Sequence, residues 1–184
     1  MTANRMGRLF AVVGPSGAGK DTLIDAARAA RPDLLIVRRV ITRPEALGGE
    51  DFEGVSEAEF AKRKVRGDFA LDWRAHGLRY GLPALQIAER LAGRDVLFNG
   101  SRAALEAAAV IFPDLVVIRV TAPSTVLMER LLARGRETRE EIAARIQRAS
   151  YEVPAELSVI DVSNDGPLQA GVARFLDAIQ PVSG

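Results

Sequence analysis

A glycine-rich turn ending in a lysine constrains the fold of this chain more than any other feature. The segment Gly14-Pro15-Ser16-Gly17-Ala18-Gly19-Lys20 fits the G-x-x-x-x-G-K pattern of a phosphate-binding loop. The apolar run Leu9–Val13 before it predicts a strand buried on both faces, and residues 22–30 after it predict a helix. In such a unit, backbone N–H groups and the helix N-terminus hold an anion. The sequence therefore predicts an α/β domain in which Lys20 reaches the β- and γ-phosphates of ATP.

The residue after the lysine departs from this pattern. Ser or Thr is usual there because its hydroxyl ligates Mg²⁺, whereas this chain has Asp21 followed by Thr22, both within the segment expected to bind ATP. A carboxylate can also bind Mg²⁺, directly or through water. An acidic side chain is equally at home in the first turn of a helix, where it offsets the helix dipole. Both interpretations of Asp21, metal ligand and helix-terminal acid, stay open.

Composition narrows the class of protein. The chain has 184 residues, 25 Lys plus Arg against 24 Asp plus Glu, and no cysteine. The length suits one domain, and the balanced charge gives no reason to expect binding to nucleic acid or a membrane surface. The lack of cysteine excludes disulfides and thiolate chemistry. No apolar run approaches the roughly 20 residues of a membrane span, and no signal-peptide pattern begins the chain. We therefore expect a cytoplasmic protein.

The rest of the chain alternates predicted strands and helices. Capping boxes at Ser56–Glu59 and Thr138–Glu141 each predict the start of a helix, and residues 42–54 read as an irregular loop. We expect strands over 34–40, 69–73, 95–98, 115–121 and 157–162, and helices over 56–67, 83–91, 101–111, 124–134, 138–150 and 168–179. We also expect turns at His76-Gly77 and Tyr80-Gly81. This order predicts a parallel sheet covered by helices on both faces.

Several short motifs resemble the guanylate kinase family in order and spacing over nearly the whole chain. They are Ile41-Thr42-Arg43-Pro44, Gly67-Asp68-Phe69, Gly77-x-x-Tyr80-Gly81 and Arg130-x-x-x-Arg134-Gly135. The resemblance implies a three-layer P-loop NTPase fold with a core at 7–37, 91–133 and 146–184. It also implies a small acceptor-binding insertion at about 38–90 and an arginine-bearing lid at about 134–145.

The residues that read guanine in that family are replaced here. By the resemblance, the positions that contact base or nucleotide carry Arg39, Ala46, Phe52, Asp72, Leu82 and Asn99. A pocket built to hydrogen-bond a base loses much affinity when its polar partners vanish. We therefore do not expect GMP to be the acceptor. Asn99 stands where phosphate-loop enzymes usually carry a strand-end acid, so we hypothesise that this carboxylate has moved to Asp21.

The same replacements resemble a narrower group, the ribose 1,5-bisphosphate phosphokinases of phosphonate breakdown. The shared segments are 14–21, Trp73-x-Ala75-x-Gly77-Leu78-x-Tyr80-Gly81, Val96-Leu97-x-Asn99-Gly100-Ser101-Arg102-Ala103, Arg134-Gly135-Arg136-Glu137 and Asn164-Asp165-Gly166. The resemblance implies transfer of a phosphoryl group from ATP, with Mg²⁺, to ribose 1,5-bisphosphate. The products would be 5-phosphoribosyl 1-pyrophosphate and ADP.

An acceptor with two phosphates calls for cations. We expect it to be bound by Arg39, Arg43, Asp72, Tyr80, Asn99 and Arg102, with Arg74 and Arg79 as further candidates. The lid residues Arg134, Arg136 and Arg145 would act with Lys20 in catalysis, whereas Arg130, Arg139 and Arg148 would include surface ion pairs. A phosphate acceptor with a second pKa near 6 needs no general base, so His76 reads as a turn residue.

Two other functions remain in view from the sequence. The chain could be a guanylate-type nucleoside monophosphate kinase, which a comparison of acceptors would separate. It could also be a non-catalytic interaction module of the guanylate-kinase-like kind, although such modules can dispense with the lysine and lid arginines that are present here.

Overall fold

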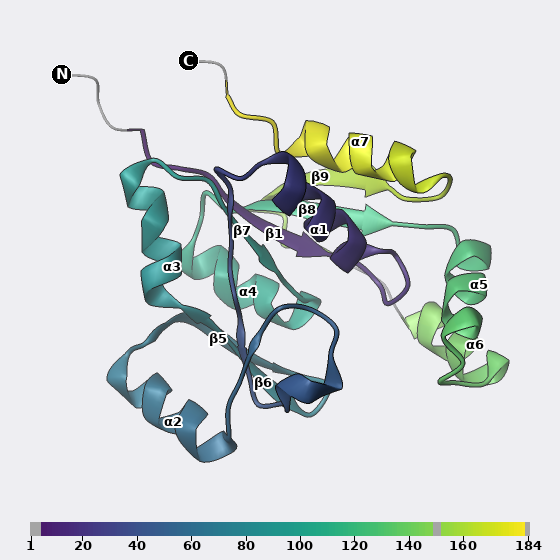
Figure 1. The fold of residues 1–184 in the computed structure, drawn as a ribbon, viewed down its shortest axis with the longest axis horizontal. Coiled ribbons are helices and arrows are strands. Elements are labelled where there is room, and N and C mark those ends of the chain that lie inside the picture. The colour runs from purple at the N-terminus through teal and green to yellow at the C-terminus, as the bar shows by residue number, and fades with distance from the viewer. Residues whose placement is uncertain (1–4, 149–151, 183–184) are drawn as a thin grey trace.

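The computed structural model describes residues 5–148 and 152–182, which form a three-layer α/β fold (Figure 1). The central sheet has five parallel strands in the order β2-β7-β1-β8-β9. Their bounds are β1 Leu9–Val13, β2 Leu35–Ile36, β7 Val96–Asn99, β8 Val116–Thr121 and β9 Ser158–Ser163. All five residues of β1 are buried, as its unbroken apolar run predicts.

Helices cover both faces of this sheet, so side chains that alternate along β1 enter two separate cores. Phe10 and Val12 pack with α1 (Lys20–Ala30) and α7 (Leu168–Ala178). Leu9, Ala11 and Val13 pack instead with α4 (Arg102–Ile111). The parallel sheet covered on both faces is therefore confirmed.

A second sheet forms the insertion, and the sequence did not predict it. Its four strands have the order β4-β3-β6-β5, with bounds β3 Val40–Ile41, β4 Glu53–Gly54, β5 Phe69–Ala75 and β6 Leu78–Pro83. The expected strand over 34–40 is divided into β2 and β3, which belong to different sheets, because the backbone N–H of Arg38 bonds to the Gln86 side chain between them.

The turn expected at Tyr80-Gly81 is instead part of β6. Gly81 is not a turn residue: a Cβ there would lie 2.7 Å from the Phe69 ring, so the glycine makes room for an aromatic side chain. The turn expected at His76-Gly77 does join β5 to β6, with His76 in the left-handed region at φ 52°.

Helix ends follow the capping signals. Ser56 Oγ accepts a hydrogen bond from the Glu59 N–H at 3.1 Å, and α2 (Glu57–Arg66) stops at Gly67. Thr138 and Glu141 bond reciprocally at the start of α6 (Arg139–Arg148); the expected end at Ser150 lies outside the described residues. The remaining helices are α3 (Ala84–Ala88), α5 (Ser124–Arg134) and the 3₁₀ turns η1 (Glu45–Leu47) and η2 (Glu89–Ala92). No helix in the described ranges is long and apolar enough to cross a membrane.

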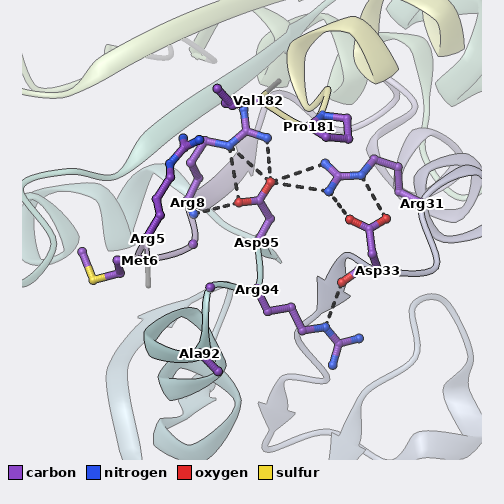
Figure 2. A pocket seen from close by; sticks show the side chains of 12 residues that line it. Arg5, Met6, Arg8, Arg31, Asp33, Ala92, Arg94, Asp95, Pro181 and Val182 are labelled. Atoms are coloured by element: carbon purple, nitrogen blue, oxygen red, sulfur yellow. Dashed lines mark hydrogen bonds and ion pairs between the residues drawn. The ribbon is translucent and has the colours of Figure 1, made fainter. Parts of the chain in front are cut away.

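A cluster of charged residues lies at the amino-terminal ends of the strands of the central sheet (Figure 2). Arg8 donates to both oxygens of Asp95 and, through Nη2, to the Gln180 carbonyl at 2.6 Å. Arg31 pairs with Asp33 and Asp95. Burial works to raise the pKa of Asp95, but the hydrogen bonds from Arg8 outweigh it and hold that pKa below its usual range. Since these arginines already have partners, the cavity of about 370 Å³ beside them is a structural junction of both chain ends.

Candidate active site

The phosphate loop connects β1 to α1 and is already shaped as a cradle. Ala18 N–H bonds back to the Pro15 carbonyl at 3.2 Å, and Gly19 takes the left-handed φ of 89° just before the helix. A Cβ on Gly19 would lie 2.5 Å from Nδ2 of Asn164, so glycine is required there for two reasons. Lys20 Nζ donates to the Gly14 carbonyl at 2.6 Å, which holds the lysine over the loop.

The ammonium group of Lys20 is held in an environment that disfavours its charge. Burial lowers its pKa from 10.5 to about 8, against the opposing effect of Asp21, and the nearby charges of Arg39 and Arg134 lower it further. Two guanidinium groups, those of Arg39 and Arg134, therefore lie close enough to Lys20 to add positive charge to this site. The three positive groups together would favour a polyanion such as a nucleotide triphosphate.

Asn164 is a buttress of the loop to which sequence reasoning assigned no role. Its side chain is buried, and Nδ2 donates to the Ala18 carbonyl at 2.7 Å. It fits between two glycines, Gly19 of the loop and Gly171 of α7, where any Cβ would collide with it. The segment Asn164-Asp165-Gly166 is one of those that resemble the ribose 1,5-bisphosphate phosphokinases, but no local sequence pattern indicates that Asn164 contacts the phosphate loop.

Arg130 also supports the loop, which corrects its expected place among the surface ion pairs. Its Nη1 donates to the Gly17 carbonyl at 3.1 Å and its Nη2 to the Asn164 carbonyl at 2.8 Å. The guanidinium therefore ties α5 to the phosphate loop and to the segment after β9. The sequence did offer one indication of this role: Arg130 lies four residues before Arg134, and residues four apart lie on the same face of a helix.

Asp21 and Asn99 lie side by side at the carboxyl edge of the sheet. Asn99 ends β7, and its Nδ2 is 3.4 Å from Asp21 Oδ1. The cap residue of α1 is Gly19, and no side chain caps this helix. A carboxylate at this edge suits Mg²⁺, which keeps several waters and binds phosphate oxygens as well. Among the described residues, no cluster of three or more His, Cys, Asp or Glu side chains could hold a metal ion by itself.

The inner face of the second sheet gathers aromatic and cationic groups. Trp73 and Tyr80 stack with ring centroids 5.4 Å apart, and the Arg39 guanidinium lies 4.8 Å from the Tyr80 ring. Burial raises the pKa of Tyr80 above its usual value, so its hydroxyl is a donor at neutral pH. Arg43 approaches the same region but donates to the carbonyls of Leu47 and Gly48.

Glu50 joins this face, and sequence reasoning missed it. Its carboxylate accepts from Nε of Arg39 at 2.9 Å and from Nη2 of the same guanidinium. Arg39 itself is only 6% exposed. A glutamate inside a loop of polar residues carries no sequence signal that separates it from its exposed neighbours.

The structure does not bring Asp72 to this face. Asp72 alternates with Leu71 and Trp73 along β5, and its carboxylate accepts from Lys64 of α2 at 2.7 Å. Arg79 points the same way and pairs with Glu57 of α2 at 3.0 Å. With Arg74, these side chains line a cleft of about 440 Å³, which Trp73 also borders. Arg102 is the first residue of α4.

The lid arginines are divided between two environments. Arg134 ends α5 and is exposed, yet its charge reaches Lys20 and lowers the pKa of that lysine. Arg136 is exposed in the turn after Gly135. Arg145, on α6, forms an ion pair with Glu137. Ile142 of α6 is completely buried and anchors that helix.

Comparison with known proteins identifies the family. The chain is 48% identical to a ribose 1,5-bisphosphate phosphokinase PhnN of Rhizobium etli over 173 residues, which are 92% of this chain and 88% of the relative. It is 46% identical to the PhnN protein of a Ruegeria species over 180 residues, with 97% and 95% coverage. The chain belongs to the PhnN family of ribose 1,5-bisphosphate phosphokinases.

Some other relatives are longer than this chain. A bifunctional ribose 1,5-bisphosphokinase-thymidine phosphorylase of Cupriavidus necator is 51% identical over 175 residues, which are 95% of this chain but 29% of that protein. The chain thus spans under a third of the bifunctional relatives. No family model matches it.

The solved structures place this chain in the guanylate-kinase-like fold that its motifs predicted. A guanylate kinase from Anaplasma phagocytophilum superposes with a TM-score of 0.68 at 18% identity, covering 95% of this chain and 85% of that one. An unliganded sugar kinase from a Janibacter species gives 0.53 at 15% identity, with 93% coverage of both chains. At such identities the likeness concerns the fold alone.

Proposed function

We propose that this protein transfers the γ-phosphoryl group of ATP to the C1 phosphate of ribose 1,5-bisphosphate, giving 5-phosphoribosyl 1-pyrophosphate and ADP. The observation that carries the proposal is near full-length identity of 41–48% to PhnN kinases. The phosphate loop with Lys20 supplies the donor site, and the Arg39–Tyr80 face supplies an acceptor site without a base-reading pocket.

The reaction needs alignment and charge neutralisation more than proton transfer. An oxygen of the C1 phosphate would attack the γ-phosphorus, and the bond from that phosphorus to the β–γ bridging oxygen would break as ADP leaves. The attacking oxygen is ionised near neutral pH, since its second pKa is about 6. His76 is exposed at the hairpin tip, in keeping with a reaction that has no general base.

The described side chains divide this work between them. Lys20 and the N–H groups of the loop would hold the β- and γ-phosphates. Arg134 would meet the charge that spreads over the transferring group, since its field already reaches Lys20. Arg136 and Arg145 would join it when the lid closes, which requires Arg145 to leave Glu137.

The acceptor and the metal would be held on either side of the loop. The acceptor would be bound by Arg39, Arg43 and Tyr80 on one wall, together with Asn99 at the end of β7 and Arg102 at the start of α4. Asp72 is left out because it faces α2. Asp21 would hold Mg²⁺, which supplies charge neutralisation at the β- and γ-phosphates. In this proposal, residues 38–90 form the acceptor-binding region and residues 134–145 form the lid. The substrates are small molecules, ATP and a sugar phosphate, and no nucleic acid takes part. We place the reaction in the cytoplasm.

The proposal is tested by the identity of the product. The protein is incubated with ATP, Mg²⁺ and ribose 1,5-bisphosphate, and phosphorus NMR follows the sugar phosphates. We expect the C1 phosphate signal to be replaced by a coupled pyrophosphate pair while the C5 phosphate signal stays unchanged. Absence of a coupled pair other than those of ATP and ADP, or a change at C5 instead, would contradict the proposed reaction.

A further inference from the structure

The Arg39 guanidinium is held on three sides by its own protein. One face lies over the Tyr80 ring at 4.8 Å, and the Trp73 ring, which stacks on Tyr80, is 5.9 Å from the guanidinium. The Nε–Nη2 edge is occupied by both oxygens of Glu50. A guanidinium that lies against aromatic rings and donates two hydrogen bonds to one carboxylate has little rotational freedom left.

The remaining edge, which ends in Nη1, is available. The hydrogen bonds of the described chain give Arg39 no protein partner beyond Glu50. Nη1 is also not among the unpaired nitrogen atoms that are sealed from solvent. A side chain that is 6% exposed therefore retains one open group of N–H donors.

The charges of the Arg39–Glu50 pair act on groups of both proposed substrate sites. The charge of Arg39 lowers the pKa of Lys20 and the charge of Glu50 raises it, and both also act on the pKa of Tyr80. Such effects operate only over short distances. The Arg39–Glu50 pair is therefore close to both the phosphate loop and the acceptor face.

We infer that Glu50 is a positioning residue of the acceptor site, which fixes Arg39 so that Nη1 is offered to a phosphate of the acceptor. This rests on the proposed function. Glu50 also provides a counter-charge to a buried arginine, whose burial alone would be costly. The acceptor need not displace Glu50, because the carboxylate and an incoming phosphate would use different edges of the guanidinium.

The first experiment compares Glu50→Ala and Glu50→Gln with Asp51→Asn. Asp51 is a matched control: it is the next residue, carries the same charge, and pairs with exposed Arg38 at 3.0 Å instead of Arg39. We expect Glu50→Ala to raise the KM for ribose 1,5-bisphosphate about 10- to 200-fold, the range of a lost charged hydrogen bond. Glu50→Gln should have a smaller effect, and the KM for ATP should stay near wild type in all three variants.

A double-mutant comparison separates positioning from a general structural role. If Glu50 acts through Arg39, adding Glu50→Ala to Arg39→Ala should leave the acceptor KM of the single Arg39 variant unchanged. The double variant also contains no buried unpaired charge, so it remains informative if Glu50→Ala alone does not fold. Circular dichroism and thermal unfolding report on folding.

Three results would overturn the inference. They are an unchanged acceptor KM in Glu50→Ala, a lower KM, which would make Glu50 a competitor of the acceptor, and additive effects in the double variant. Failure of the wild-type protein to use ribose 1,5-bisphosphate would instead refute the proposed function. Wild-type turnover with unaffected Glu50 variants would refute only the role of Glu50.

Discussion

Replacing Gly171 with alanine should weaken ATP binding from a helix that does not touch the nucleotide. Gly171 lies in α7, and a Cβ there would be 2.1 Å from Asn164 Oδ1 and 2.9 Å from its Cγ. Asn164 would have to move, and its bond to the Ala18 carbonyl of the phosphate loop would be lost. The substitution thus links a helix interior to the shape of the loop.

The expected magnitude follows from three opposing contributions. Alanine improves helix propensity by about 1 kcal/mol. Overpacking costs about 1–3 kcal/mol, and an unpaired buried carbonyl costs about 1–3 kcal/mol more. The free energy of unfolding should therefore fall by about 1–5 kcal/mol, or roughly 2–4 °C in Tm for each kcal/mol at this chain length.

Thermal unfolding and steady-state kinetics measure the two effects. We expect a lower Tm and a higher KM for ATP, with the KM for the acceptor unchanged. Gly166→Ala is the matched control, because a Cβ at Gly166 has no neighbour within 4 Å. A Gly171→Ala protein as stable as wild type, with unchanged KM for ATP, would refute the role of Asn164 as a buttress.

Three further predictions concern the phosphate-transfer groups. Lys20→Ala should abolish turnover and leave Tm near wild type, as activity assays and thermal unfolding would check; full activity in the folded variant would contradict the donor site. Arg134→Ala should lower kcat far more than it raises either KM, since Arg134 would meet charge that develops during transfer; an effect on the acceptor KM alone would remove it from the lid. The pKa of Lys20 in the free protein is about 8, so kcat/KM for ATP should fall as the pH rises through about 8 and the ammonium loses its proton. In the ATP complex the phosphates favour the ammonium, so kcat should hold to higher pH; identical pH profiles for kcat and kcat/KM would contradict this.

The central sheet could be predicted from the sequence because its signals are local. The apolar run of β1, the glycines of the loop and the acid-rich helix starts each act within a few residues. The second sheet was missed because its glycine, Gly81, serves contact with Phe69 across the sheet, a requirement that looks like a turn in the sequence.

From the sequence, roles in the candidate site could be assigned only to residues that belong to a recognisable short motif. Lys20 and Arg134 are assigned from motifs, whereas the contacts of Asn164, Arg130 and Glu50 join segments that are distant in the sequence. The face of Asp72 could have been predicted, since Leu71 and Trp73 on either side are apolar and successive strand side chains point to opposite faces. Pairing of Arg145 with Glu137 depends on the lid conformation and has no local signal.

The most direct test of the central claim is the choice of acceptor. A coupled assay of ADP release should measure kcat/KM for ribose 1,5-bisphosphate and for GMP at the same ATP and Mg²⁺ concentrations. Arg39 stands on the Tyr80 face where the guanylate kinase resemblance implies a nucleotide contact, and its charge suits a phosphate more than a base. We predict a preference for ribose 1,5-bisphosphate by orders of magnitude. A higher kcat/KM for GMP would contradict the proposed substrate and leave only a general phosphate-loop kinase.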